Sequence, residues 1–164
     1  MAQVYVSIGS NIERKRNIGH ALQALAAAYG DLQQSSVYES AAVGFDSTPF
    51  YNLVVAFQTD DSPRAVQETL HRIEDSQGRL RAGKLAARTL DLDLLLYDDL
   101  VINAGKLVLP RDDIDRYAFV LGPLAEIAGE RRHPVSGKRY ADMWAAFDAT
   151  GQELQRIDWP PAAG

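Results

Sequence analysis

The chain has 164 residues, with 17 Lys and Arg against 22 Asp and Glu, three His and no Cys. This length fits one globular domain that buries its core without disulfides or a structural metal. The lack of cysteine excludes thiol catalysis, iron–sulfur ligation and a disulfide scaffold. The net charge of −5 argues against a surface that coats nucleic acid or binds an anionic membrane.

The sequence predicts a single cytoplasmic domain. No basic segment followed by an apolar stretch opens the sequence, and no run reaches the roughly 20 apolar residues of a membrane span. We therefore expect a cytoplasmic protein without a membrane anchor. One domain is predicted over residues 1–159, and the Pro-Pro-Ala-Ala-Gly tail at 160–164 is predicted to fray.

Short apolar runs alternate with amphipathic helices along the first two thirds of the chain. The pattern predicts, in order, a strand at 4–8, a helix over 18–29, an edge strand at 32–39, a strand at 51–57, a helix over 63–77 and a strand over 89–97. This βαββαβ order predicts an α+β, ferredoxin-like fold, in which two helices pack on one face of an antiparallel sheet. A hairpin of residues 100–102 and 107–109, and short helices near 117–126 and 140–147, are predicted to follow.

The strand at 89–97 carries two acidic residues on one face. Asp91 and Asp93 alternate with Leu90, Leu92, Leu94 and Leu96, which we expect on the opposite, buried face. Asp is disfavoured in strands, and like charges roughly 7 Å apart repel unless a cation lies between them. Carboxylates without nearby His or Cys suit Mg²⁺ that bridges to substrate phosphates. The alternative is an ordinary amphipathic strand with a solvated outer face.

A basic segment lies immediately before this strand. Residues 79–88 contain Arg79, Arg81, Lys84 and Arg88 and no acidic residue, so the rest of the chain carries 13 positive and 22 negative residues. Alone, such a segment is typical of a solvated loop. Beside a predicted metal site it indicates phosphoryl transfer, in which arginine neutralises phosphate oxygens. The sequence contains neither a P-loop nor a kinase-type glycine loop.

Two aromatic residues and one amide are candidates for binding a flat ring. Phe50 is followed closely by Asn52, and Phe119 comes after the acidic strand. Each alone is typical of a core residue, but together they can stack on a heteroaromatic ring and bind its edge.

The motifs Val-Ser-Ile-Gly-Ser-Asn at 6–11, Phe-Tyr-Asn at 50–52, His-Arg-Ile-Glu at 71–74, Gln-Gly-Arg at 77–79 and Arg-Thr-Leu-Asp-Leu-Asp-Leu at 88–94 carry a family resemblance. Over nearly its whole length the chain resembles the 6-hydroxymethyl-7,8-dihydropterin pyrophosphokinases of folate biosynthesis. The resemblance implies a ferredoxin-like fold and the transfer of pyrophosphate from ATP to the pterin hydroxymethyl group, with release of AMP. It also implies small-molecule partners, pterin and ATP, and a monomer or weak dimer.

The resemblance further implies roles for particular residues. Asp91 and Asp93 would bind two Mg²⁺ ions and act in catalysis with Arg79 and Arg88. The pterin site would comprise Phe50 and Phe119 against the ring, Asn52 at its edge, and the backbone of Ser40 and Val43. The nucleotide would contact His71, Glu74, Arg79, Arg81, Arg88, Leu94, Lys106, Arg111 and Arg116.

Several positions depart from the family pattern on the triphosphate side. The usual Trp-Gly-Pro is Leu85-Ala86-Ala87, the Pro-His motif is Pro110-Arg111, and Tyr117 replaces an arginine, with Arg116 next to it.

Two alternatives to an active kinase stay open. One is a pterin- or nucleotide-binding paralogue with weak or no turnover, regulatory or acting on a modified pterin. The other is an RNA-binding module of the same element order, although the acidic strand would repel a phosphate backbone.

Overall fold

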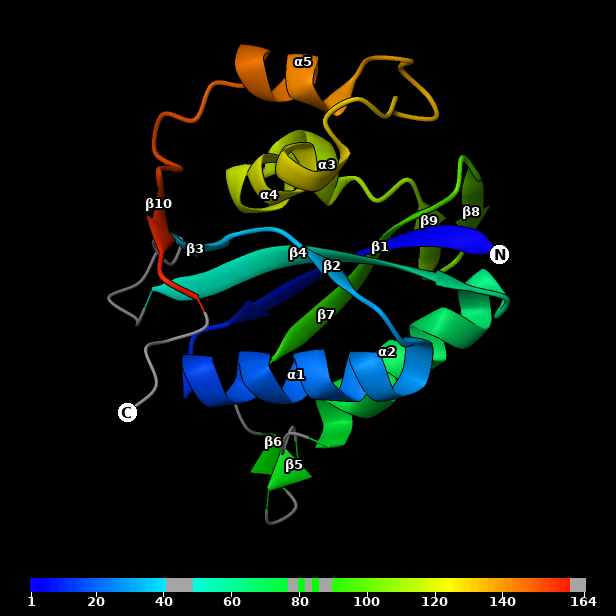
Figure 1. Ribbon diagram of the computed structural model, residues 1–164, viewed down its shortest axis with the longest axis vertical. Coiled ribbons are helices and arrows are strands. Elements are labelled where there is room, and N and C mark those ends of the chain that lie inside the picture. The colour runs from blue at the N-terminus through cyan, green and yellow to red at the C-terminus, as the bar shows by residue number, and fades with distance from the viewer. Residues whose placement is uncertain (41–48, 77–79, 82–83, 86–89, 160–164) are drawn as a thin grey trace.

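The computed structural model describes residues 1–40, 49–76, 80–81, 84–85 and 90–159, with the backbone alone at 80–81 and 84–85. A central antiparallel sheet lies between two layers of helices (Figure 1). Its main strands are β1 (Ala2–Ser10), β3 (Val37–Ser40), β4 (Phe50–Thr59), β7 (Asp91–Tyr97) and β10 (Leu154–Ile157). They are ordered β10-β3-β4-β1-β7, and the short β2 (Gln33–Gln34) also pairs with β4.

The helices divide between the two faces of the sheet. On one face lie α1 (Arg14–Tyr29) and α2 (Pro63–Ser76), and on the other lie α3 (Asp113–Arg116), α4 (Ala118–Ala128) and α5 (Tyr140–Ala146). The predicted ferredoxin-like fold is confirmed: the order β3-β4-β1-β7 and two helices on one face follow from the βαββαβ pattern. The C-terminal helices cover the second face, and β10 adds a strand to one edge.

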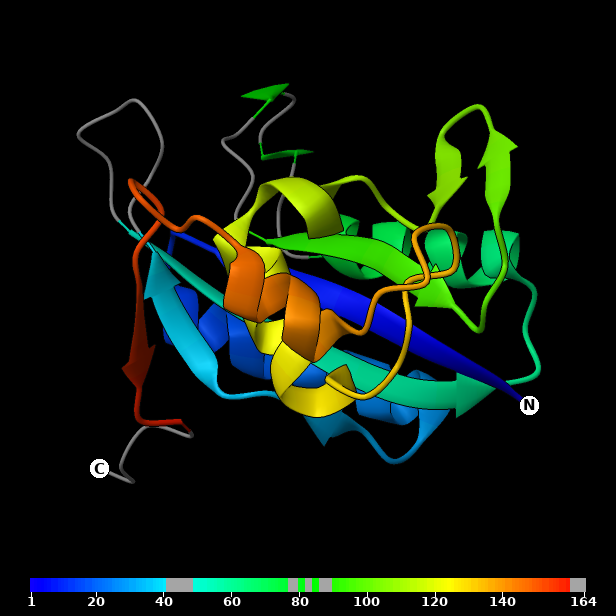
Figure 2. The same cartoon turned by 90° about the horizontal axis from the view of Figure 1, so that it is seen from above.

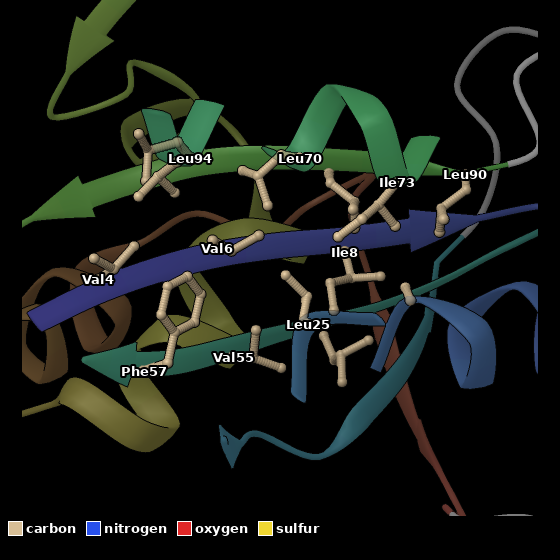
Figure 3. Close-up of a cluster of buried hydrophobic side chains, with 14 of the residues drawn as sticks. Val4, Val6, Ile8, Leu25, Val55, Phe57, Leu70, Ile73, Leu90 and Leu94 are labelled. Atoms are coloured by element: carbon tan, nitrogen blue, oxygen red, sulfur yellow. The ribbon is translucent and has the colours of Figure 1, made fainter. Parts of the chain in front are cut away.

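Alternation along the strands sends side chains into two separate cores. Val4, Val6 and Ile8 of β1 pack with Leu25 of α1 and Leu70 of α2 in the first core (Figure 3). The intervening residue Tyr5 faces the second core, formed with α4 and α5. Because both faces are apolar in this part of the sheet, both are sealed from water by helices.

The strand β7 departs from simple alternation near its end. Leu90, Leu92 and Leu94 lie in the first core as expected, but Leu96 lies in the second core. The prediction that all four leucines share one face was therefore wrong for Leu96. The register explains the difference: Val6 pairs with Leu94 and Tyr5 pairs with Leu96, which leaves an extra residue in β7. After such a bulge, the side chains that follow point to the opposite face of the sheet from the one that simple alternation predicts.

Two small hairpins lie outside the central sheet. The first, β5 (Leu80–Arg81) and β6 (Lys84–Leu85), lies in the basic segment and was not predicted. The second, β8 (Ile102–Ala104) and β9 (Leu107–Leu109), projects from the sheet in Figure 2. Its first strand lies later than residues 100–102 because the tight turn at Gly105, with φ +64°, pairs Ala104 with Leu107. Within the described ranges, no helix has the length and apolar character needed to cross a membrane.

Candidate active site

A cavity of about 340 Å³ opens on the face of the sheet that α4 covers. The strand register places its floor: Gly9 of β1 lies between Asn52 of β4 and Asp91 of β7, and Ser7 lies beside Asp93. These positions continue the side of β1 that carries Tyr5 in the second core, but their side chains are small. The sheet surface is therefore left hollow there. The lining comprises Ser7, Gly9, Ser40, Phe50, Asn52, Asp91, Asp93, Asp113, Tyr117 and Phe119.

Aromatic side chains form part of this lining. Phe50 comes from the start of β4 and Phe119 from the first turn of α4. The ring of Tyr117 stacks on that of Phe119 with centroids 5.0 Å apart and planes 22° from parallel. The structure thus brings together Ser40, Phe50, Asn52 and Phe119, as predicted from sequence, and adds Tyr117 to the lining. Val43 lies outside the described residues.

Asn52 is held rigidly at the polar floor. Its side chain is buried, and Nδ2 donates a hydrogen bond to Oγ of Ser40 at 2.8 Å. Its Oδ1 approaches Gly9 so closely that a Cβ at position 9 would lie 2.8 Å from it. Glycine therefore fits position 9 without strain, whereas any larger residue would force the neighbouring amide or β1 to shift.

Carboxylates gather along one side of the cavity. Asp91 and Asp93 project from β7 as the alternation predicted, and Asp113 at the start of α3 joins the lining. Nothing in the sequence distinguished Asp113 from its acidic neighbours. Arg111 lies beside this group: its Nη2 is 3.5 Å from Oδ1 of Asp93, and its Nε donates to Oδ2 of Asp113 at 3.2 Å.

The acidic side chains suit a hard cation that is bound partly by the protein and partly by oxygen atoms of a substrate. Asp91 and Asp93 offer carboxylate oxygens, which Mg²⁺ prefers. In the described part of the chain, no group of three or more His, Cys, Asp or Glu residues is arranged to hold a metal. Two carboxylates are the usual protein contribution to a Mg²⁺ site that also takes substrate phosphates, so Asp91 and Asp93 would be the residues to hold such an ion.

A second, smaller hollow of about 30 Å³ lies beside the first and shares Asp93 with it. It is lined from α2, β7 and β9, and its polar residues include His71, Lys106 and Arg111 next to Leu94. Four residues predicted at the nucleotide site are thus brought together: His71, Leu94, Lys106 and Arg111. Asp93 is thus common to the linings of both hollows.

Other predicted nucleotide residues lie elsewhere. Glu74 is buried, and its carboxylate accepts a hydrogen bond from the backbone N–H of Leu92 at 2.8 Å. This bond joins α2 to β7, so a nucleotide contact by Glu74 stays a prediction. Arg116 is exposed on α3 and lines neither hollow. Arg79 and Arg88 lie outside the described residues, as does the side chain of Arg81.

The chain is similar to a known family and to several of its members. Residues 5–129 match the family described as 7,8-dihydro-6-hydroxymethylpterin-pyrophosphokinase (HPPK). Over 134 residues the chain is 37% identical to the 2-amino-4-hydroxy-6-hydroxymethyldihydropteridine pyrophosphokinase of Haemophilus influenzae, covering 79% of this chain and 84% of the relative. Over 158 residues it is 34% identical to the same-named protein of Pseudomonas aeruginosa, covering 92% and 95%.

A solved structure shows the same fold. The Plasmodium falciparum HPPK-DHPS chain crystallised with pterin and p-hydroxybenzoate superposes with a TM-score of 0.71 at 14% identity, covering 88% of this chain and 42% of that one. The chain therefore spans less than half of that two-part protein. The matched segment contains the acidic strand and the residues of both hollows from Ser7 to Phe119. This chain belongs to the 7,8-dihydro-6-hydroxymethylpterin-pyrophosphokinase family.

Proposed function

We propose that the chain transfers pyrophosphate from ATP to the hydroxymethyl group of 6-hydroxymethyl-7,8-dihydropterin, giving AMP and the pterin diphosphate. The observation that carries this proposal is that Asp93 lines two hollows of unlike chemistry. One has aromatic rings and a buried amide, which suit a flat heteroaromatic ring with polar edges. The other has cationic side chains, which suit phosphate groups.

The larger cavity would bind the pterin. Phe50 and Phe119 provide apolar surfaces on which a bicyclic ring stacks, and Asn52 offers both a donor and an acceptor to its edge. Because the amide of Asn52 is already held by Ser40 and fitted against Gly9, little side-chain freedom is lost when the pterin binds. The backbone of Ser40 and of Val43 is expected to complete this site.

The acidic side of the cavity would receive the metal-bound triphosphate. Asp91 and Asp93 would hold Mg²⁺, for which we expect two ions, and the bound metal would supply charge neutralisation and lower the pKa of the attacking hydroxyl. Arg111 and Lys106 would donate hydrogen bonds to phosphate oxygens, and His71 and the backbone of Leu94 would lie near the nucleoside. Glu74, Arg79, Arg81, Arg88 and Arg116 remain predicted to contact ATP, with Arg79 and Arg88 taking part in catalysis.

In the proposed reaction, the protein mainly positions the two substrates and neutralises their charge. The hydroxymethyl oxygen attacks the β-phosphorus, and the bond from that phosphorus to the bridging α,β-oxygen breaks. AMP departs with the bridging oxygen, and the hydroxyl proton passes to solvent. In phosphoryl transfer, alignment of the attacking and leaving oxygens and neutralisation of charge supply most of the rate enhancement. The adjacency of the two hollows at Asp93 supports such an alignment.

The direct test is AMP release from purified protein with Mg²⁺, ATP and 6-hydroxymethyl-7,8-dihydropterin. We expect AMP and pterin diphosphate in equal amounts, with no AMP when the pterin is left out. Pterin binding without AMP formation would instead favour the binding paralogue. The departures that motivate this alternative are Arg111, Tyr117 and the Leu85-Ala86-Ala87 segment. Of these, Tyr117 lines the cavity, where its ring stacks on Phe119.

We also propose that residues 1–159 form one catalytic domain in the cytoplasm. Both hollows draw on segments between Ser7 and Phe119, and β10 completes the sheet that carries them. We expect a monomer, with a weak dimer as the alternative. Sedimentation equilibrium over a hundredfold concentration range would show a constant mass of 18.0 kDa for a monomer.

A further inference from the structure

The side chain of Gln152 bridges two helix ends beside the cavity. Its Oε1 accepts a hydrogen bond from the backbone N–H of Ala118 at 2.9 Å, and its Nε2 donates to the carbonyl of Arg116 at 3.3 Å. Ala118 is the first residue of α4 and Arg116 the last of α3. One amide thus satisfies a donor at the start of one helix and an acceptor at the end of the other, where the helices themselves provide no partner.

The residue between these two hydrogen bonds is Tyr117, which lines the cavity. Its own backbone is fixed as well: its N–H donates to the carbonyl of Asp113 at 3.0 Å, and its carbonyl accepts from Leu121 at 3.0 Å. Tyr117 stacks on Phe119, and both rings line the cavity. The orientation of this two-ring wall therefore depends on the backbone at 116–118, which Gln152 holds from both sides.

The segment that carries Gln152 is itself held in place. A turn precedes it, in which the N–H of Gln152 donates to the carbonyl of Ala149 at 2.8 Å and Gly151 has φ +79°. Two residues further on, Leu154 pairs with Ser40 across β10 and β3. A Cβ at Gly122 of α4 would lie 3.0 Å from Cδ1 of Leu154. The C-terminal segment therefore contacts both the helix that carries Phe119 and the strand that carries Ser40.

We propose that Gln152 is a positioning residue that sets the aromatic wall of the substrate cavity. It acts on the pterin through Tyr117 and Phe119 and contacts no substrate itself. This role rests on the proposed function for the identity of the ligand. Gln152 lies outside residues 5–129, which match the family. Its role rests on its hydrogen bonds to Ala118 and Arg116. Losing one hydrogen bond at position 118 would let the start of α4 shift, and aromatic stacking is sensitive to ring placement.

The test compares Gln152→Ala and Gln152→Glu with Gln155→Ala, which changes an exposed side chain of the same segment. Equilibrium binding of 6-hydroxymethyl-7,8-dihydropterin is measured without ATP, and KM is measured for both substrates. We expect Gln152→Ala to weaken pterin binding and raise the pterin KM about tenfold while the KM for ATP stays within about twofold. Gln152→Glu, which keeps the acceptor for Ala118 and loses the donor, should fall between Ala and wild type.

The outcomes separate this inference from the function on which it rests. Equal changes in both KM values, or a pterin affinity unchanged in Gln152→Ala, would overturn the positioning role while the kinase stands. A wild-type protein that does not bind the pterin would overturn both. If Gln152→Ala unfolds at the assay temperature, Gln152→Glu carries the test, because it retains the bond that begins α4. A Gln155→Ala variant with the same tenfold loss would contradict a role specific to Gln152.

Discussion

Arg111 lies between two carboxylates at the border of the two hollows, with Nη2 3.5 Å from Oδ1 of Asp93. About a third of each side chain is exposed, so the pair is accessible to an incoming ligand, and water screens much of its attraction. A phosphate group that carries several charged oxygens would compete well for this guanidinium. The arrangement therefore places a cation beside Asp93, which lines both hollows.

Removing this cation should weaken ATP use more than pterin binding. Arg111→Ala is expected to raise the KM for ATP about ten- to a hundredfold, the loss expected for one or two hydrogen bonds to a charged group. Pterin affinity, measured by equilibrium binding, should change less than about twofold because the ring-binding side chains remain. Arg64→Ala, an exposed arginine at the start of α2, is the matched control. A parallel loss of pterin affinity would show that Arg111 mainly organises the cavity.

The acidic strand gives a second prediction. Asp93→Asn keeps the size of the side chain but removes a charge from the position that lines both hollows. If Asp93 holds Mg²⁺, turnover should fall at least about a thousandfold, because metal neutralisation contributes several kcal/mol to phosphoryl transfer. The circular dichroism spectrum and melting temperature should stay close to wild type. Asp99→Asn, in an exposed turn, serves as the control, and near-normal AMP release by Asp93→Asn would rule out this metal assignment.

The sequence could predict the parts of the site that depend on local pattern. Asp91 and Asp93 share a face because strand alternation is a local rule, and Phe50 and Asn52 lie two residues apart on one strand. Leu96 could not be placed, since the bulge in β7 arises from its pairing with β1. Gln152 and Ala118 are 34 positions apart, and no periodicity links them. Asp113 likewise reaches the cavity only because a short helix follows Arg111.

The floor of the cavity gives a third prediction, which tests steric fit. Gly9→Ala would place a methyl group 2.8 Å from Oδ1 of Asn52, so the amide or β1 must shift. Overpacking of this kind should lower the free energy of unfolding by about 1–3 kcal/mol. It should also weaken pterin binding, because Asn52 would leave its position. Urea unfolding and equilibrium pterin binding measure the two effects.

The matched control for Gly9 is Gly19, which lies in the middle of α1. A Cβ there meets nothing within 4 Å. Gly19→Ala should therefore stabilise the protein by about 0.5–1 kcal/mol, since alanine loses less backbone entropy than glycine in a helix. Pterin affinity should not change. A Gly9→Ala variant that binds pterin normally would show that Asn52 can move without consequence.

Glu126 of α4 binds Ser36, which lies between β2 and β3, and Tyr38 of β3. Its carboxylate accepts hydrogen bonds from the N–H of Ser36 at 2.9 Å, from Oγ of Ser36 at 2.8 Å and from Oη of Tyr38 at 2.6 Å. Burial by itself raises the pKa of Glu126, but the bonds from Tyr38 and Ser36 outweigh it and leave the pKa lowered. Burial, together with the bond to Glu126, raises the pKa of Tyr38 to about 12. The phenol therefore stays protonated and continues to donate at neutral pH.

These pKa shifts predict a stability that depends on pH. A carboxyl group whose pKa is lower in the folded state stabilises the protein above its unfolded pKa, and this contribution disappears as the pH falls through the folded pKa. Glu126→Gln should therefore lower the free energy of unfolding at pH 7 by about 1 kcal/mol, a modest loss because the group is partly exposed. The difference from wild type should shrink as the pH falls below 4.5, the ordinary pKa of a glutamate side chain. Urea unfolding at pH 7 and at pH 3 measures it, with the exposed Glu68→Gln as control. A deficit that is equal at both pH values would mean that the ionised carboxylate is not what stabilises this contact.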